Sequence, residues 1–313
     1  MTTQAPARSG PSGATPKPQR PRLEEMGLGI GKLTRLRRML YERGAHNGTA
    51  LFLPIDQGLE HGPRDFFANP ESLDPEYQWK LAVAGGYSGI ALQIGLAQKY
   101  ATPYAGRVPL LLKLNGKTDI PSSKQPLSPL NASVEEAVRL GADAVGYTIY
   151  VGSALQAEDF VQFARMRREA ELLGMPVVVW AYPRGEFVDA KGGQESPYAV
   201  EYAARVACEL GADVVKVNFP VANPEKAGQQ PKPYSTLVYD PLEDMQRVVA
   251  AAGRTPLLLS GGERVDDEEL FTKARVALQA GVTGFIFGRN IWQRPHAAAT
   301  EVIQKLWDLL GQY

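Results

Sequence analysis

Short apolar runs alternate with longer amphipathic segments along most of the chain. The short runs predict strands at residues 51–56, 89–94, 109–114, 144–150, 176–182, 214–218, 256–260 and 284–288. The longer segments repeat apolar residues every three or four positions. They predict helices at residues 31–44, 134–140, 157–173, 197–210, 240–252 and 266–280. The strand runs are almost continuously apolar, which is typical of parallel strands covered on both faces.

Eight strand–helix units predict a (β/α)₈ barrel. The motif Leu-Gly-Ala-Asp ends a helix before a strand twice, at residues 140–143 and 210–213, which supports a repeated unit. A doubly wound open sheet is the alternative, but it does not usually need eight regular units. We expect one barrel domain over residues 23–313. Residues 1–22 contain five prolines and no apolar periodicity, which predicts a disordered tail.

Composition limits the possible functions. Hydrophobic residues make up 44% of the 313, which is enough for a large core, and no long uncharged apolar run predicts a membrane span. Lys plus Arg and Asp plus Glu both total 34, so net charge gives no reason to expect nucleic acid as a partner. The single cysteine excludes an intrachain disulfide. Since the tail lacks features of a secretory or transit signal, we expect a cytoplasmic protein.

Lys216 lies in an apolar strand, between Val215 and Val217. Burial of a lysine lowers its pKa and leaves a neutral amine that can attack a carbonyl. A lysine at a strand end can also extend its ammonium into solvent, and for an isolated lysine that is the better interpretation. Polar residues at the ends of neighbouring strands favour the buried, neutral amine. Alternation places Tyr182 and Trp180 on one face of their strand, where Tyr182 can meet Lys216. Trp180 alone is better explained as part of the barrel wall.

Two glycine-containing loops follow the seventh and eighth strands, where barrels often bind phosphate. They contain Ser260, Gly261 and Gly262, then Gly288 and Arg289. Glycines let backbone amides approach an anion, and arginine adds paired donors. The two loops together therefore predict a phosphate site.

Two other patterns suggest sites that we set aside. Asp56, Glu60, His61 and Asp65 could form a magnesium site, but a substrate-contacting loop is the better interpretation. The chain has only three histidines, too few for a histidine-rich zinc site. The glycine run at residues 27–32 follows no strand and lacks the Ser or Thr of a phosphate-binding loop.

Taken together, these motifs resemble the archaeal-type class I fructose-bisphosphate aldolases, which also occur in bacteria. The resemblance extends from about residue 51 to residue 292. It rests on Asp56-Gln-Gly-Leu-Glu-His-Gly-Pro63, Tyr147-Thr-Ile-Tyr150, Trp180-Ala-Tyr-Pro-Arg184, Ala212-Asp-Val-Val-Lys216, Ser260-Gly-Gly262 and Gly288-Arg-Asn-Ile-Trp292.

The resemblance implies a barrel enzyme with no metal or other cofactor, acting on phosphorylated ketoses and trioses. It also implies a ring-like homo-oligomer, often a decamer in this family. Lys216 matches the Schiff-base lysine, Tyr182 the proton donor and acceptor, and Asp56 a catalytic and substrate-contacting position. The matches to substrate and phosphate contacts are His61, Asp65, Trp180, Arg184, Asn218, Ser260, Gly261, Gly262, Gly288 and Arg289.

This chain departs from the family pattern at two positions. Gln57 replaces a histidine, and Asn218 replaces a second lysine found in many members. A proline-rich insertion follows at residues 220–240. Two sister activities use the same lysine, namely a phospho-pentanedione thiolase and an amino-deoxyheptulosonate synthase, so the lysine does not separate them from the aldolase. A barrel that only binds sugar phosphates is a further alternative, but it would have no use for both a buried amine and an inward tyrosine.

Overall fold

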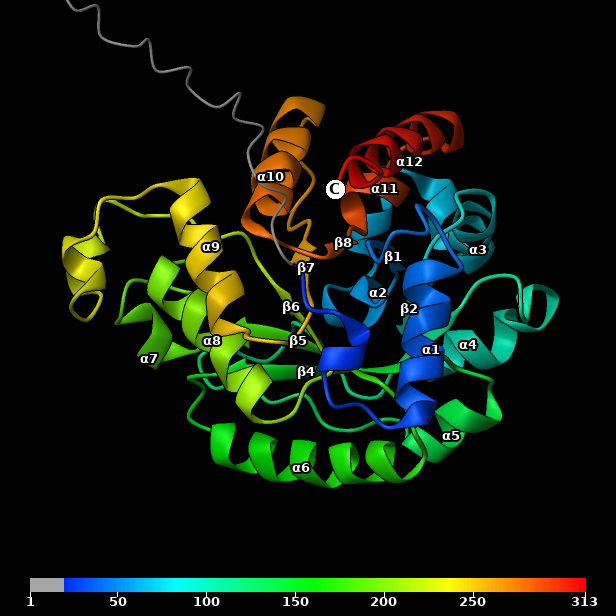
Figure 1. Cartoon of the computed structure of the whole chain (residues 1–313), viewed down its shortest axis with the longest axis horizontal. Coiled ribbons are helices and arrows are strands. Elements are labelled where there is room, and N and C mark those ends of the chain that lie inside the picture. Colours follow the sequence, from blue (N-terminus) through cyan, green and yellow to red (C-terminus); the bar gives the residue numbers. More distant parts are fainter. Residues whose placement is uncertain (1–19) are drawn as a thin grey trace, which may run out of the picture.

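Eight parallel strands form a closed barrel in the computed structural model, which describes residues 20–313 (Figure 1). Most of the predicted tail of residues 1–22 therefore lies outside the described residues. The strands are β1 (Ala50–Pro54), β2 (Gly89–Gln93), β3 (Leu110–Lys113), β4 (Ala144–Val151), β5 (Val177–Pro183), β6 (Val214–Val217), β7 (Leu257–Ser260) and β8 (Gly284–Ile286). Each strand pairs with the next, and β1 pairs with β8. This closure confirms the predicted barrel and excludes the open sheet.

Helices surround the barrel and join its strands (Figure 1). They are α1 (Ile30–Tyr41), α2 (Gln57–Glu60), α3 (Pro75–Ala84), α4 (Ile94–Tyr100), α5 (Val134–Arg139), α6 (Gln156–Leu172), α7 (Glu186–Asp189), α8 (Pro197–Glu209), α9 (Pro241–Ala251), α10 (Asp267–Ala280), α11 (Arg289–Trp292) and α12 (His296–Leu310). The helix predicted at 31–44 ends earlier, at Tyr41. Beyond it the chain turns back through Gly44 and His46, both with positive φ, and the Gly48 amide bonds the Leu40 carbonyl.

Helix α1 closes the amino-terminal end of the barrel. Its Leu36, Met39 and Leu40 pack against inward side chains of the strands, including Phe52 and Leu111. The outward side chains of the strands form a second apolar cluster against the surrounding helices. The barrel is therefore filled with side chains at this end, and only its carboxyl end can be hollow.

Two basic residues attach α1 to the repeated Leu-Gly-Ala-Asp motifs. Lys32 Nζ lies 2.9 Å from Asp213 Oδ2, and Arg38 pairs with Asp143. Asp213 also accepts the backbone N–H of Val177 at 2.8 Å. The glycine run at residues 27–32 therefore ends in a lysine that forms a structural ion pair. This pair lies at the amino-terminal end of the barrel, opposite the predicted site.

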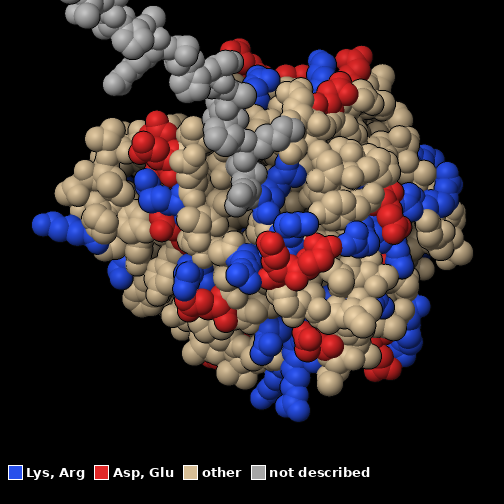
Figure 2. Space-filling model, in the orientation of Figure 1, with Lys and Arg blue, Asp and Glu red and all other residues tan. Residues whose placement is uncertain are grey.

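The segment 220–240 forms two short 3-10 turns, Ala227–Gln229 and Tyr234–Thr236. Gln230 is buried and accepts the Tyr198 N–H at 3.3 Å, which fixes the segment to the start of α8. On the face shown in Figure 2, acidic and basic side chains lie interspersed in small groups.

Candidate active site

A cavity of about 560 Å³ opens at the carboxyl ends of the strands. Eleven of the residues predicted from the sequence line it: Asp56, His61, Tyr182, Arg184, Lys216, Asn218, Ser260, Gly261, Gly262, Gly288 and Arg289. The other two, Asp65 and Trp180, are not part of its wall. Both contact residues that do line the cavity, Asp65 through His61 and Trp180 through Lys216.

Lys216 points into the barrel for a simple reason of strand geometry. Val214, two residues earlier on β6, belongs to the inward core above α1, so Lys216 faces inward as well. Only 5% of Lys216 is exposed, and its Nζ is hydrogen-bonded to the hydroxyl of Tyr182. Burial, the largest effect, lowers the pKa of Lys216 to about 7. A substantial fraction of Lys216 is therefore a neutral amine near neutral pH.

Tyr182 is a neutral phenol in the free protein. Burial raises its pKa above the ordinary value, and the Glu60 and Asp56 carboxylates raise it further. The Arg184 guanidinium lies 5.1 Å from the centre of the Tyr182 ring and acts in the opposite direction. The Arg184 charge is too weak an influence to ionise Tyr182, whose pKa stays raised. The phenol is set up first to donate a proton.

Trp180 lies beneath the reactive groups. Its ring is 5.3 Å from Lys216 Nζ and 4.7 Å from Lys113 Nζ, and the residue is 1% exposed. Cations interact favourably with the face of an indole, so this ring supports both amines. This placement agrees with the interpretation of Trp180 as part of the barrel wall.

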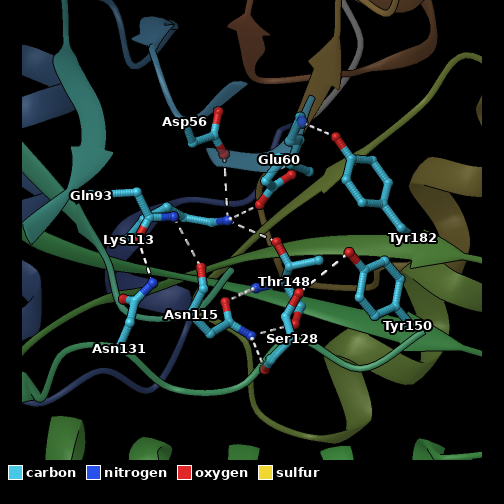
Figure 3. A network of polar contacts seen from close by, with 11 residues as sticks. Asp56, Glu60, Gln93, Lys113, Asn115, Ser128, Asn131, Thr148, Tyr150 and Tyr182 are labelled. Carbon is cyan, nitrogen blue, oxygen red and sulfur yellow. Dashed lines mark hydrogen bonds and ion pairs between the residues drawn. The ribbon is translucent and has the colours of Figure 1, made fainter. Parts of the chain in front are cut away.

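No motif in the sequence assigns a role to Lys113. Its side chain is fully buried, and its Nζ lies 2.8 Å from Thr148 Oγ1, 3.1 Å from Glu60 Oε1 and 3.4 Å from Asp56 Oδ2 (Figure 3). Gly146 leaves the space for it, because a Cβ there would lie 2.7 Å from Lys113 Cδ. The available signal was a lysine ending an apolar strand run, the same signal that identified Lys216.

The two glycine-containing loops are joined by Asn290. Its Nδ2 donates to the carbonyl oxygens of Gly261 at 2.9 Å and Glu263 at 3.1 Å, and its Oδ1 accepts the Val265 N–H at 3.0 Å. A Cβ at position 261 would lie 2.9 Å from Asn290 Nδ2, so a larger residue there would displace the Asn290 side chain. Gly262 has a φ of 62°, which also favours glycine. Asn290 therefore holds the β7 loop against the β8 loop.

Asp65 contacts two residues that line the cavity. Its Oδ2 is 2.7 Å from His61 Nδ1 and 3.8 Å from Arg289 Nη1. Its backbone carbonyl accepts Gln293 Nε2 at 2.7 Å. Within residues 20–313, no group of three or more His, Cys, Asp and Glu side chains is arranged to hold a metal ion. Asp56 and Glu60 instead face Lys113.

A closed (β/α)₈ barrel with a buried amine beside a phenol, and with glycine-containing loops at the same mouth, defines the class of lyases that act through a lysine imine. The family described as DeoC/LacD family aldolase matches residues 50–294. The chain belongs to this family.

Individual relatives agree with this assignment. The chain is 44% identical to the class 1 fructose-bisphosphate aldolase of Thermoproteus tenax over 254 residues, 81% of this chain and 87% of that protein. It is similar to an archaeal fructose-1,6-bisphosphate aldolase structure in which the catalytic lysine is covalently bound to the carbinolamine intermediate of the substrate. That match has 39% identity and a TM-score of 0.74, covering 88% of this chain and 99% of the other. A fructose-bisphosphate aldolase of Slackia heliotrinireducens matches with 29% identity and a TM-score of 0.78, over 94% and 93% of the two chains.

Among the described residues, no helix is both long and apolar enough to cross a membrane.

Proposed function

We propose that this chain is a class I fructose-1,6-bisphosphate aldolase, which reversibly cleaves the bisphosphate to dihydroxyacetone phosphate and glyceraldehyde 3-phosphate, a reaction of glycolysis and gluconeogenesis. The observation that carries the proposal is the contact between the buried Lys216 amine and the Tyr182 hydroxyl at the cavity floor. The activity named for the relatives supports it.

Imine formation begins with Lys216. Its nitrogen lone pair attacks the C2 carbonyl carbon of the open-chain ketose, and a proton passes from that nitrogen to the carbonyl oxygen to give a carbinolamine. The Tyr182 phenol then protonates the C2 hydroxyl, which leaves as water. The products are a protonated imine on Lys216 and a tyrosinate at Tyr182. The new cation beside Tyr182 stabilises that tyrosinate.

Carbon–carbon cleavage follows from this charge pair. The Tyr182 oxygen takes the proton of the C4 hydroxyl, and the electron pair of the C3–C4 bond moves toward the protonated imine. The aldehyde leaves, and an enamine of the triose remains on Lys216. Protonation at C3 and addition of water release the second product and restore the amine. A well-placed acid or base of this kind contributes roughly 10²–10⁴-fold.

The surrounding residues would position the substrate. Ser260, Gly261 and Gly262 with Gly288 and Arg289 are proposed to hold a phosphate at the β7–β8 side of the cavity. Arg184, His61 and Asn218, which also line the cavity, are proposed to contact the remainder of the sugar phosphate. Asp56 is proposed to orient a substrate hydroxyl or to assist proton transfer during imine formation. Binding energy from the phosphate holds the C2 carbonyl against Lys216.

We further propose that the protein works in the cytoplasm as a homo-oligomer. The resemblance to the class I aldolase family, which implies a ring-like homo-oligomer, supports this. Sedimentation velocity on the purified protein tests this, and a single species with the mass of one chain would contradict it.

A coupled assay tests the proposed activity. The protein should release glyceraldehyde 3-phosphate from fructose 1,6-bisphosphate without coenzyme A, and Lys216→Ala should release none. Acyl transfer to coenzyme A without cleavage of the bisphosphate would replace the aldolase with the thiolase activity. Binding of sugar phosphates without any turnover would leave only a binding function.

A further inference from the structure

Two lysines are buried at the mouth of the same barrel, and their surroundings differ. Lys113 Nζ is in contact with two carboxylates and a hydroxyl, as Figure 3 shows. Lys216 Nζ contacts the Tyr182 hydroxyl, and no carboxylate lies within ion-pair distance of it among the described residues. The proposed mechanism uses Lys216 and leaves the buried charge of Lys113 unexplained.

The positions of Asp56 and Glu60 give Lys113 a part in the reaction. Asp56 follows β1 and Glu60 ends α2, and both carboxylates turn toward Lys113 from one side of the cavity. Thr148 on β4 fixes the Lys113 ammonium from another side at 2.8 Å. The Trp180 ring lies near both amines. Asp56 and Glu60 also act on the charge of Lys216, so without the Lys113 ammonium their charge would fall more strongly on that amine.

We propose that Lys113 is a positioning residue: its ammonium binds Asp56 and Glu60 and thereby leaves the Lys216 amine free to attack the substrate. The inference rests on the proposed imine chemistry of Lys216. Lys113 itself touches no reacting atom.

The charges around Lys216 support this role. Asp56 and Glu60 raise its pKa, whereas Lys113 and Arg184 lower it, in addition to the larger effect of burial. The Tyr182 hydroxyl also faces the Lys216 amine. Burial lowers the pKa of Lys113, but Glu60 and Asp56 more than offset this, and the pKa of Lys113 is raised above its ordinary value. Lys113 therefore stays an ammonium at pH values where Lys216 can lose its proton.

The test is the pH dependence of borohydride trapping with dihydroxyacetone phosphate. In Lys113→Met, the midpoint of trapping should move up by about one pH unit or more, because two carboxylates then stabilise the Lys216 ammonium. At a pH below both midpoints, the trapping rate should fall about tenfold or more. Lys99→Met, which removes an exposed lysine of α4, should keep the wild-type profile.

Two further variants keep the test decisive if Lys113→Met does not fold. Glu60→Gln removes one carboxylate and should move the midpoint down. Lys113→Met combined with Glu60→Gln should return the midpoint toward the wild-type value, which a purely structural defect would not do. Circular dichroism and thermal unfolding establish that each variant is folded.

The outcomes separate this inference from the proposed function. If the folded Lys113→Met variant traps with the wild-type midpoint, or Glu60→Gln leaves the midpoint unchanged or raises it, the role of Lys113 is refuted. If the wild-type protein traps no triose phosphate at Lys216 at any pH, the proposed function itself fails.

Discussion

At the scale of single residues, the chemistry depends on which neighbours each buried group has. Lys216 and Tyr182 are both buried, and both are pushed toward their neutral forms. For lysine this creates a nucleophile, and for tyrosine it creates a proton donor. The same physical effect therefore prepares both partners of the first step.

Tyr182→Phe should separate the two steps of the reaction. The variant keeps the Lys216 amine, and water can protonate the leaving C2 hydroxyl in place of the phenol, so it should still trap dihydroxyacetone phosphate under borohydride, only more slowly. Cleavage of fructose 1,6-bisphosphate should fall about 10²-fold or more, because the C4 hydroxyl then has no base. Steady-state kinetics and mass spectrometry measure the two effects. Cleavage at the wild-type rate would remove Tyr182 from the mechanism.

Asn290→Ala should weaken the phosphate site without touching Lys216. The side chain bonds two carbonyls of the β7 loop and one amide beyond it, so its loss frees that loop. We expect KM for the bisphosphate to rise several-fold, while the pH midpoint of trapping stays where it is. An unchanged KM in a stable protein would show that the loop does not contact substrate phosphate.

At the scale of elements, two-residue alternation explains why the polar residues converge. On β6 both Val214 and Lys216 point into the barrel, and on β7 both Leu258 and Ser260 do. The apolar end of each strand packs on α1, and the polar end lines the cavity. Strand pattern alone therefore predicts which residues of the strands themselves meet at the barrel mouth.

The attachment of α1 can be tested by comparing two basic residues of that helix. Lys32→Met leaves the buried Asp213 carboxylate without its ammonium and should lower the free energy of unfolding by about 3 kcal/mol. Arg37→Met removes an exposed pair with Glu24 and should change stability little. Urea unfolding of both variants gives the comparison. Equal effects would mean that the Lys32 pair is not specifically important.

Parts of the site could not be predicted from the sequence, for physical reasons. Periodicity locates residues on strands, so Lys216 and Tyr182 were found. Glu60 comes from a short turn of helix after β1, where no repeating pattern fixes the direction of a side chain. No pattern in the sequence therefore predicts that Glu60 pairs with Lys113. The contacts of Asp65 with His61 and Arg289 had no sequence signature for the same reason.

At the scale of the whole molecule, the reactive amine should reduce stability. The pKa of Lys216 is about 7 in the folded protein and near 10.5 when unfolded. Between these values the unfolded chain binds more protons, so stability should rise with pH across this window. Below about pH 7 the cost is fully present.

Lys216→Met should therefore raise Tm, with the largest gain at pH 7 and below and a smaller gain toward pH 10. Differential scanning calorimetry across this range gives the result. A variant that is less stable than the wild type at pH 7 would show that Lys216 is not held in an unfavourable environment.

The proposed reaction also needs no metal, because the imine accepts the electrons of the broken bond. Prolonged EDTA treatment should leave cleavage of fructose 1,6-bisphosphate unchanged. Loss of activity that zinc or magnesium restores would contradict this.

The central claim is that Lys216 forms the covalent imine. Borohydride reduction in the presence of dihydroxyacetone phosphate, followed by peptide mapping, tests it most directly. We predict one modified residue, Lys216, and no modification in Lys216→Ala. Labelling at Lys113 or Lys117 instead, or cleavage activity that survives in Lys216→Ala, would contradict the account.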